Sequence, residues 1–215
     1  ASAQPWFAQY PKSTPATIDT NEFRSVADVM KVAFDRFRQR PAFVNMDKVM
    51  SYGDLDQASL RFACFLRNHL GLKKGDRVAI MLPNVLQYPV ALLGILRAGL
   101  TVVNTNPMYT ARELKHQLND SGAAAILVLE NFATTLEEVI KDTSVKHVIT
   151  SAVGDMLGFP KSLIVNFVVK YRKKAVPAFN LPNAIKFNDA LSKGAGQSLP
   201  ATDIGPDDLA FLQYT

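Results

Sequence analysis

The chain has 215 residues, of which 48% are hydrophobic and 20% are charged, and this balance is typical of a soluble globular protein with one substantial core. Its formal net charge of +5 permits attraction to nucleic acid, to anionic membranes or to phosphorylated ligands, but it selects none of them. Cys64 is the only cysteine, which excludes a disulfide within the chain and favours a reducing compartment. No apolar run reaches the roughly 20 residues that a bilayer-spanning helix needs.

Residues 1–20 contain three prolines and three aromatic side chains, and we expect them to form an extended arm pinned by the aromatics. A first helix should begin at Ser25, because Ser25 and Asp28 have the spacing of a capping box. Pro41 should follow the end of this helix.

A small hairpin is expected next, from residues 42–45 and 49–52. Ser51 and Asp54 form a second capping box, which predicts a helix with Gly71 just beyond its end.

Residues 77–122 hold the centre of the predicted fold. Residues 77–82 and 100–104 are short apolar runs of the kind that form strands buried on both faces, and each is followed by a helix-length segment. The unit therefore reads as strand, helix, strand, helix, and Thr110 and Glu113 form a capping box at the second helix.

Within the first of these two helices we expect Asn84 to act as the N-cap residue. Gly94 and Ala98 stand four positions apart, and this spacing should let the helix approach the sheet closely.

Three further strands are predicted at residues 124–129, 145–150 and 209–213, with a helix between the first two. The fold class is therefore α/β, a mainly parallel sheet flanked by helices, with the small N-terminal hairpin beside it. We interpret residues 1–215 as a single α/β subdomain in which residues 151–206 form a helical and irregular insertion before the last strand.

The segment from Lys161 to Lys174 has two interpretations. Its apolar residues recur at helical spacing, and basic residues cluster at its end. It is either a core-packed helix whose cations favour its C-terminus or an interfacial helix that touches anionic lipid.

The chain offers few candidates for catalytic or metal-binding residues. His69, His116 and His147 share no ligand spacing, and Cys64 has no basic neighbour that would activate its thiol, so we interpret all four as structural or surface residues. Residues 193–198 are superficially like a phosphate loop, but no strand precedes them, and we interpret them as an ordinary loop.

Several stretches together are similar to the amino-terminal part of the bacterial long-chain fatty-acid–CoA ligases, which are members of the adenylate-forming (AMP-binding) superfamily. The similarity covers nearly the whole chain. The residues that carry it are 41–45, 73–79, 82–84, 86–91, 95–99, 102–104, 106–107, 109–110, 112–114, 116–123, 166–170 and 208–215.

This resemblance implies that Tyr214 and Thr215 open a phosphate loop and that both bind the nucleotide, with Thr215 touching phosphate and Tyr214 supporting the loop. Asn104, Asn106 and Tyr109 would have at most a structural role beside this site. No catalytic residue and no metal ligand is assigned within the chain. Most of the nucleotide-binding motifs, the acyl tunnel, the second subdomain and the C-terminal domain would lie beyond residue 215.

The reaction implied by the resemblance joins a long-chain fatty acid to CoA. The fatty carboxylate attacks the α-phosphate of ATP, with Mg²⁺ neutralising phosphate charge, and the thiol of CoA then displaces AMP. ATP, Mg²⁺ and CoA are thus expected for the parent enzyme, and none is expected on residues 1–215 alone, for which we predict no ligase activity. The expected location is the cytoplasm, with peripheral contact at the inner membrane through residues 161–174.

Two alternatives stay open. The chain could belong to another acid–CoA ligase of the same superfamily, or it could be a non-catalytic α/β module that contacts lipid or nucleic acid. Basic residues outside 170–174 are scattered and are not interleaved with aromatics, which argues against a nucleic-acid surface. The sequence leaves open whether the protein forms a homodimer.

Overall fold

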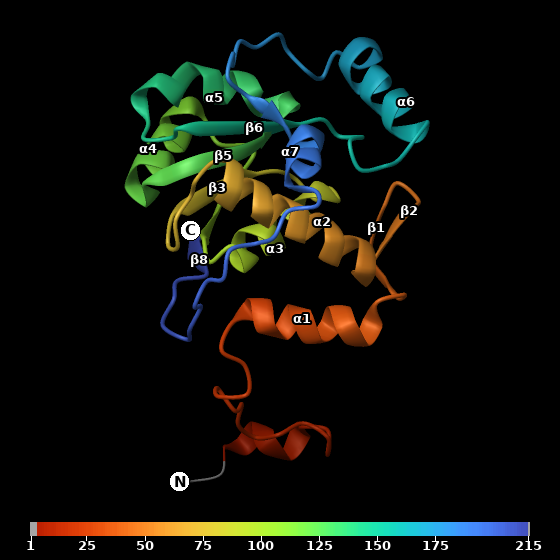
Figure 1. Ribbon diagram of the computed structural model, residues 1–215, viewed down its shortest axis with the longest axis vertical. Coiled ribbons are helices and arrows are strands. Elements are labelled where there is room, and N and C mark those ends of the chain that lie inside the picture. Colours follow the sequence, from red (N-terminus) through yellow and green to blue (C-terminus); the bar gives the residue numbers. More distant parts are fainter. Residues whose placement is uncertain (1–3, 215) are drawn as a thin grey trace.

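A computed structural model describes residues 4–214 of the chain (Figure 1). Six strands form one sheet in the order β7-β6-β5-β3-β4-β8, and every neighbouring pair in it is parallel. The strands are β3 (Arg77–Met81), β4 (Thr101–Asn104), β5 (Ala123–Leu129), β6 (His147–Ser151), β7 (Ile185–Lys186) and β8 (Phe211–Gln213). The predicted parallel α/β fold is confirmed, and the two-residue β7 is a strand that the sequence did not reveal.

Helices cover both faces of this sheet, so the molecule has three layers (Figure 1). The helices of the main body are α2 (Tyr52–Cys64), α3 (Gln87–Arg97), α4 (Ala111–Ser121), α5 (Ala133–Val139) and α7 (Phe187–Gly194). Val78 and Ile80 of β3 belong to the core shared with α2, α3 and α7, whereas Ala79 and Met81 belong to the core shared with α4 and α5. Alternate side chains of one strand therefore enter two separate cores, as expected of a strand buried on both faces.

The direction of each crossover explains which face its helix covers. The chain passes from β3 through α3 to β4 on one side, and then through α4 back to β5 on the other side of β3. Right-handed crossovers that run in opposite directions place their helices on opposite faces, and α3 and α4 do lie in different cores. The long return from β7 to β8 carries α7 on the α3 face.

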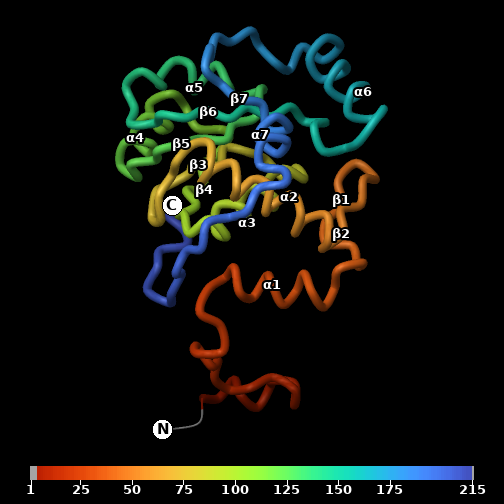
Figure 2. The backbone as a smooth tube through the Cα atoms, viewed as in Figure 1, coloured from red at the N-terminus to blue at the C-terminus, as the bar shows by residue number. Residues whose placement is uncertain are grey.

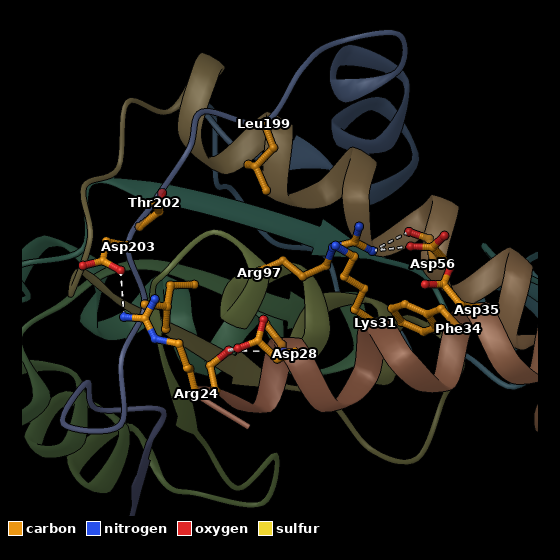
Figure 3. Close-up of a pocket in the computed structure, with 13 residues that line it drawn as sticks. Arg24, Asp28, Lys31, Phe34, Asp35, Asp56, Arg97, Leu199, Thr202 and Asp203 are labelled. Atoms are coloured by element: carbon orange, nitrogen blue, oxygen red, sulfur yellow. Dashed lines mark hydrogen bonds and ion pairs between the residues drawn. The ribbon is translucent and has the colours of Figure 1, made fainter. Parts of the chain in front are cut away.

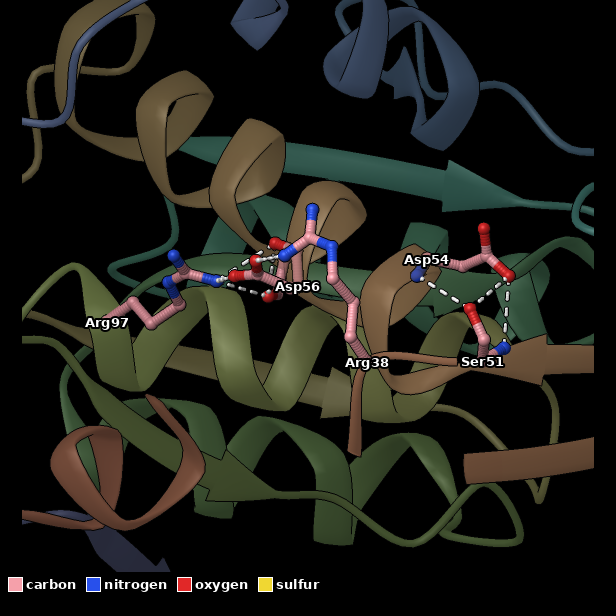
Figure 4. Close-up of polar contacts among 6 residues, drawn as sticks. Arg38, Ser51, Asp54, Asp56 and Arg97 are labelled. Carbon is pink, nitrogen blue, oxygen red and sulfur yellow. Dashed lines mark hydrogen bonds and ion pairs between the residues drawn. The ribbon is translucent and has the colours of Figure 1, made fainter. Parts of the chain in front are cut away.

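The predicted hairpin consists of β1 (Pro41–Asn45) and β2 (Lys48–Ser51), which pair antiparallel. At the start of α2, the Ser51 Oγ accepts from the Asp54 backbone N–H at 3.1 Å, and the Asp54 carboxylate accepts from the Ser51 N–H at 3.0 Å (Figure 4). The Ser51 N–H and the Ser51 hydroxyl both donate to the Asp54 carboxylate and lower the pKa of Asp54, the backbone bond being the largest cause. The capping box at Thr110 and Glu113 is also formed, and Ser25 caps α1 (Val26–Phe37).

Asp56 ties three helices together on the α2 side of the sheet (Figure 4). Its carboxylate lies 2.7 Å from Arg97 Nη1 at the end of α3, and 3.7 Å from Arg38, which follows the last residue of α1. Arg97 Nη1 also donates to the Asp56 carbonyl at 2.9 Å and to the Ser59 hydroxyl at 3.0 Å. A half-buried guanidinium with three acceptors is well satisfied, so Arg97 joins α3 to α2 by hydrogen bonds as well as by charge.

The expected N-cap at Asn84 is wrong. The first residue of α3 is Gln87, and its N-cap residue, Leu86, makes no side-chain capping bond. The carbonyl of Asn84 accepts from the Asn45 side chain at 3.2 Å, which joins this loop to the hairpin. Pro89 is the third residue of α3 and has no N–H, so this helix start has one fewer backbone donor that needs a cap.

Gly94 does allow a close approach, but the element that approaches it is a helix and not the sheet that was expected. A Cβ at Gly94 would lie 2.9 Å from Phe62 Cδ1 and 3.0 Å from the Ser59 carbonyl oxygen, and both belong to α2. The glycine therefore permits close approach between two helices on the same face, and not between a helix and the sheet.

The N-terminal arm contains an unexpected short helix, and the insertion before the last strand contains the helix expected in it. Residues 5–9 form a short 3-10 helix, η1 (Pro5–Gln9), where an extended arm was expected, and Figure 2 shows residues 4–25 lying apart from the sheet. Between β6 and β7 lie α6 (Lys161–Phe167) and a π-helical turn, η5 (Val168–Arg172). Neither element contains a buried residue, so the core-packed interpretation of residues 161–174 is wrong.

The shorter elements complete the chain. A π-helical turn, η2 (Phe65–His69), follows α2. One 3-10 turn, η3 (Glu130–Phe132), precedes α5, and another, η4 (Ile140–Asp142), follows it. No helix in the described range 4–214 has the length and hydropathy to cross a bilayer.

We predict that Gly94→Val lowers the free energy of unfolding by about 1–3 kcal/mol, because the new side chain overpacks the contact between α3 and α2. Denaturant unfolding followed by circular dichroism measures this change. Gly205→Val is the matched control: a Cβ there has no neighbour nearer than 3.9 Å, so we expect a change within about 0.5 kcal/mol. Equal stability of the two variants would contradict the packing role of Gly94.

Candidate functional site

The carboxyl ends of β3, β4 and β8 form the candidate site. The chain leaves the adjacent strands β3 and β4 toward helices on opposite faces, and in open parallel sheets such a reversal creates a crevice where ligands bind. Strand β8 continues this edge, because Gln213 lies opposite Asn104 in the parallel register of β8 and β4.

A ladder of polar side chains crosses this edge of the sheet, with Asn104 at its centre. The Tyr88 hydroxyl at the start of α3 donates to Asn104 Oδ1 at 2.9 Å, and Asn104 Nδ2 donates to Gln213 Oε1 at 2.9 Å. On the opposite face, Gln117 Nε2 from α4 donates to the Asn104 carbonyl at 2.8 Å. Burial raises the pKa of Tyr88, while its bond to Asn104 opposes that shift. Asn104 thus connects both helix layers to the last strand.

Tyr214 leaves β8 and is anchored to α4. Its hydroxyl donates to Asp120 Oδ2 at 2.6 Å. Burial, and then the hydrogen bond and charge of Asp120, raise the pKa of Tyr214 to about 12. The phenol is therefore a stable donor at neutral pH, and it fixes the direction in which the chain leaves the sheet.

The sequence-predicted site residues have different outcomes. Thr215 lies outside the described residues 4–214, while Tyr214 and Asn104 both lie at the carboxyl edge. Asn106 and Tyr109 build the turn that follows β4: Asn106 Oδ1 accepts from the Met108 N–H at 2.9 Å, and the Asn106 carbonyl accepts from the Tyr109 N–H at 3.1 Å. These two residues shape the loop, which agrees with the structural role expected of them.

A cavity of about 460 Å³ lies elsewhere, between α1 and residues 199–204 (Figure 3). Most of its charged lining is already paired within the chain. Arg24 lies 3.0 Å from Asp203, Ser25 Oγ lies 3.0 Å from an Asp28 carboxylate oxygen, and Arg97 is held by Asp56. Charges that satisfy one another leave little to recognise a ligand, so we interpret this cavity as the seam between α1 and the main body.

The remaining candidates from the sequence are structural. Cys64 is fully buried, and burial raises the pKa of its thiol. The His69 Nε2 lies 2.9 Å from the Lys193 carbonyl oxygen and 2.7 Å from Gln197 Nε2, so the loop that is superficially like a phosphate loop is held against η2, the turn that follows α2. Across residues 4–214, no three His, Cys, Asp or Glu side chains gather as a set of metal ligands.

The model of the AMP-binding enzyme family matches residues 30–215. The chain belongs to this family. The match covers more than four-fifths of the chain and includes every strand of the parallel sheet.

Curated relatives give finer similarity. The chain is 53% identical over 210 residues to a long-chain-fatty-acid–CoA ligase of Salmonella typhimurium, 52% identical over 210 residues to one of Escherichia coli O6:H1, and 31% identical over 215 residues to one of Bacillus subtilis. Each alignment covers at least 98% of this chain. The chain spans only about 37% of the length of the Salmonella and Escherichia relatives.

Solved structures confirm the fold. An anthranilate CoA ligase in complex with anthranoyl-AMP matches 90% of this chain and 32% of its own with a TM-score of 0.71 at 15% identity. A long-chain-fatty-acid-CoA ligase from Archaeoglobus fulgidus matches 89% of this chain and 34% of its own with a TM-score of 0.67 at 21% identity. These identities support a shared fold and carry no information on substrate.

Tyr88, Gln117 and Asp120 were not predicted as site residues from the sequence. Gln117 had a detectable signal in the sequence, because it falls on the same helix face as the apolar Leu114 and Leu118. In the structure its side chain is 1% exposed. A polar side chain on the buried face of an amphipathic helix needs a partner. Tyr88 and Asp120 carried no comparable signal.

We predict that Asn104→Ala loosens β8, because the change removes both the acceptor of Tyr88 and the donor to Gln213. The peptide that contains β8 should exchange its amide hydrogens faster, and stability should fall by about 1–2 kcal/mol. Hydrogen–deuterium exchange with mass spectrometry measures both effects. Asn119→Ala, which removes a side-chain bond to the Asp142 carbonyl away from β8, serves as the control. Unchanged exchange in β8 would show that the ladder does not hold the strand.

We predict that Asp120→Asn lowers the pKa of Tyr214 from about 12 toward the usual value of about 10, because the charge that opposes ionisation is removed. The shift should be partial, since burial is the larger cause and persists. An NMR titration of the isotope-labelled tyrosine ring measures it. Asp142→Asn, which removes a partner of Lys115, should leave this titration unchanged. The same titration in wild type and Asp120→Asn would contradict the contact.

Proposed function

We propose that the chain is the amino-terminal α/β part of a long-chain fatty-acid–CoA ligase. The observation that carries this proposal is the 50–53% identity to bacterial ligases of this type over 98% of the chain. The match to the AMP-binding family and the reversal of the crossovers between β3 and β4 agree with it. The second subdomain and the C-terminal domain would follow residue 215.

The proposed reaction has two steps. The carboxylate of a long-chain fatty acid attacks the α-phosphate of ATP and releases pyrophosphate, which gives an acyl-adenylate. The thiol of CoA then attacks the acyl carbon and releases AMP. The first step is needed because a carboxylate is a poor electrophile, whereas AMP is a good leaving group.

We assign Tyr214 and Thr215 to the nucleotide site. The register of β8 with β4 supports this assignment, since it places Gln213 at the carboxyl edge beside Asn104. The bond from Tyr214 to Asp120 holds the next residue against α4. In this role Thr215 would donate its hydroxyl to a phosphate oxygen, and Tyr214 would hold the start of the loop. The hydrogen bonds among Tyr88, Asn104 and Gln213 would set the position of β8, the strand that leads to Tyr214 and Thr215.

Magnesium is proposed for the complete enzyme, where it would neutralise phosphate charge. The described residues do not fit a magnesium site, because no set of three candidate ligands is present among them. We therefore derive no step through the metal from this part of the chain.

We also propose a cytoplasmic protein that contacts the inner membrane peripherally. A single cysteine in the chain fits a reducing compartment. Long-chain fatty acids partition into bilayers, since each buried methylene contributes about 0.8 kcal/mol, so contact with a membrane would bring the enzyme to its substrate.

The alternative within the family is a ligase for a different acid. The 50–53% identity to curated fatty-acid enzymes argues against it. The solved structures, at 15–21% identity, share the fold with aromatic-acid and fatty-acid ligases alike and do not separate the two. A non-catalytic binding module is less well supported, because the family match is to enzymes.

We predict that the full-length parent catalyses ATP–pyrophosphate exchange in the presence of long-chain fatty acids, and much less exchange with benzoate or anthranilate. The incorporation of labelled pyrophosphate into ATP, measured across acyl chain lengths, tests this. Residues 1–215 alone should show no exchange, because only the start of the proposed phosphate loop is present. Exchange that responds to aromatic acids and not to fatty acids would overturn the substrate assignment, and none with any acid would overturn the function.

A further inference from the structure

The net positive charge of the chain is concentrated in one short segment. Residues 161–174 contain five basic residues and no acidic residue. The whole chain has 24 basic and 19 acidic residues, so the 19 basic residues outside this segment match the acidic ones in number. The formal charge of +5 is therefore the charge of α6, η5 and the two lysines that follow.

The same segment presents an apolar face to solvent. Leu163, Ile164, Phe167 and Tyr171 recur at spacings of one, three and four residues and are 55–63% exposed. The rings of Phe167 and Tyr171 lie 5.2 Å apart, so the face is continuous across the junction of α6 and η5. We refer to these four residues as the apolar face. Isolated apolar side chains on a surface are ordinary, whereas four on one face of one helix indicate a binding surface.

The opposite side of α6 is fastened to the main body. Asn166 Oδ1 accepts from the Gly154 N–H at 2.7 Å, and Asn166 Nδ2 donates to Asp155 at 3.2 Å. A Cβ at Gly154 would meet Asn166 Oδ1 at 2.7 Å, which shows how closely the helix is held. Val165 packs against the edge of the core. These contacts fix the orientation of the helix, so the apolar face points outward.

The hairpin supports the first turn of α6. Lys161 Nζ contacts the Met46 carbonyl oxygen and lies 3.3 Å from Asp47 Oδ2. Met46 at the hairpin tip is 47% exposed and Phe159 just before α6 is 85% exposed. Lys161 is thus paired, and the cations left on the helix are Lys170, Arg172, Lys173 and Lys174, all near its C-terminal end and all exposed.

We propose that the apolar face and the four cations near its end form the surface through which the protein docks on a bilayer with anionic headgroups. The inference rests on the proposed function, because it names the surface by which the proposed ligase would reach its membrane-dissolved substrate. Apolar side chains enter the boundary between headgroups and acyl chains, while long basic side chains reach the headgroup phosphates.

The combination of groups favours lipid over other partners. A nucleic acid would pair with the cations and leave the apolar face uncovered. A protein segment would have to supply an apolar groove together with acidic groups for four cations. An anionic bilayer supplies both from one surface, and each basic residue near it contributes about 1 kcal/mol of attraction.

Flotation of the full-length protein with vesicles tests the inference. Vesicles of phosphatidylglycerol and phosphatidylethanolamine are compared with neutral phosphatidylcholine vesicles. We expect Lys173→Glu together with Lys174→Glu to weaken binding to the anionic vesicles by about tenfold or more. Phe167→Ser should also weaken it severalfold. The matched control, Lys141→Glu with Lys146→Glu, changes the net charge equally at exposed positions outside the segment and should have little effect.

Ligase activity with a fatty acid short enough to stay in solution is measured in parallel. Normal activity in the variants shows that they fold and that the proposed function stands. Three results would each overturn the proposed membrane surface. They are equal weakening of vesicle binding by the control pair, unchanged vesicle binding in the Lys173 and Phe167 variants, and no vesicle binding by the wild type. Binding of a nucleic-acid duplex that competes with vesicles would overturn the choice of lipid. If the wild type shows no ligase activity, the proposed function is overturned. The vesicle result then still decides whether the membrane surface exists.

Discussion

The burial of β3 on both faces is the constraint on which the rest of the structure depends. A strand with no solvent face must have a neighbouring strand on each side and a helix layer above and below it. Strand β3 lies between β5 and β4, and its alternate side chains enter two separate cores. Both partners are parallel to β3, so the chain must cross over after each strand, and the crossovers run in opposite directions. The carboxyl edge where they diverge is therefore produced by the same requirement that buries Val78 and Ala79.

Because that edge is where the backbone leaves the sheet, its polar groups need partners from side chains. Asn104 lies at the point of divergence. Its amide joins Tyr88 of the α3 layer to Gln213 of the last strand, and its carbonyl accepts from Gln117 of the α4 layer. The side chain and the carbonyl of one residue thus connect the two helices that flank β4 in sequence to β8, which lies more than 100 residues further along the chain. The hydrogen bond from Asn104 to Gln213 also positions β8, which leads to the start of the proposed phosphate loop.

Local features of the fold could be predicted from the sequence, and features that depend on a distant partner could not. The capping boxes at Ser51 and Thr110 involve residues three positions apart, so the sequence contains the whole interaction. Gly94 showed that something approaches α3 closely, but only the tertiary structure shows that it is α2. Strand β7 has two residues and exists because β6 offers it an edge. In the candidate site, the family resemblance pointed to Tyr214, whereas the contacts of Asp120 with Tyr214 and of Tyr88 with Asn104 arise only on folding.

The apolar face of α6 shows why periodicity alone cannot decide between a core helix and a surface helix. Both kinds of helix have an apolar stripe in their sequence. They differ only in whether the rest of the protein provides a surface that covers this stripe. Here α6 follows β6 at the end of the sheet, where the only further strand is the two-residue β7, and this leaves little sheet for a helix to pack on. The stripe therefore stays outside, and Asn166 holds the other side of the helix. This end of the sheet is opposite to β8 in the strand order, so the proposed membrane surface and the proposed nucleotide site lie at different edges (Figure 1). A bilayer can then cover one edge while the other stays open to ATP, and this separation allows charge changes on α6 to be tested without disturbing the site.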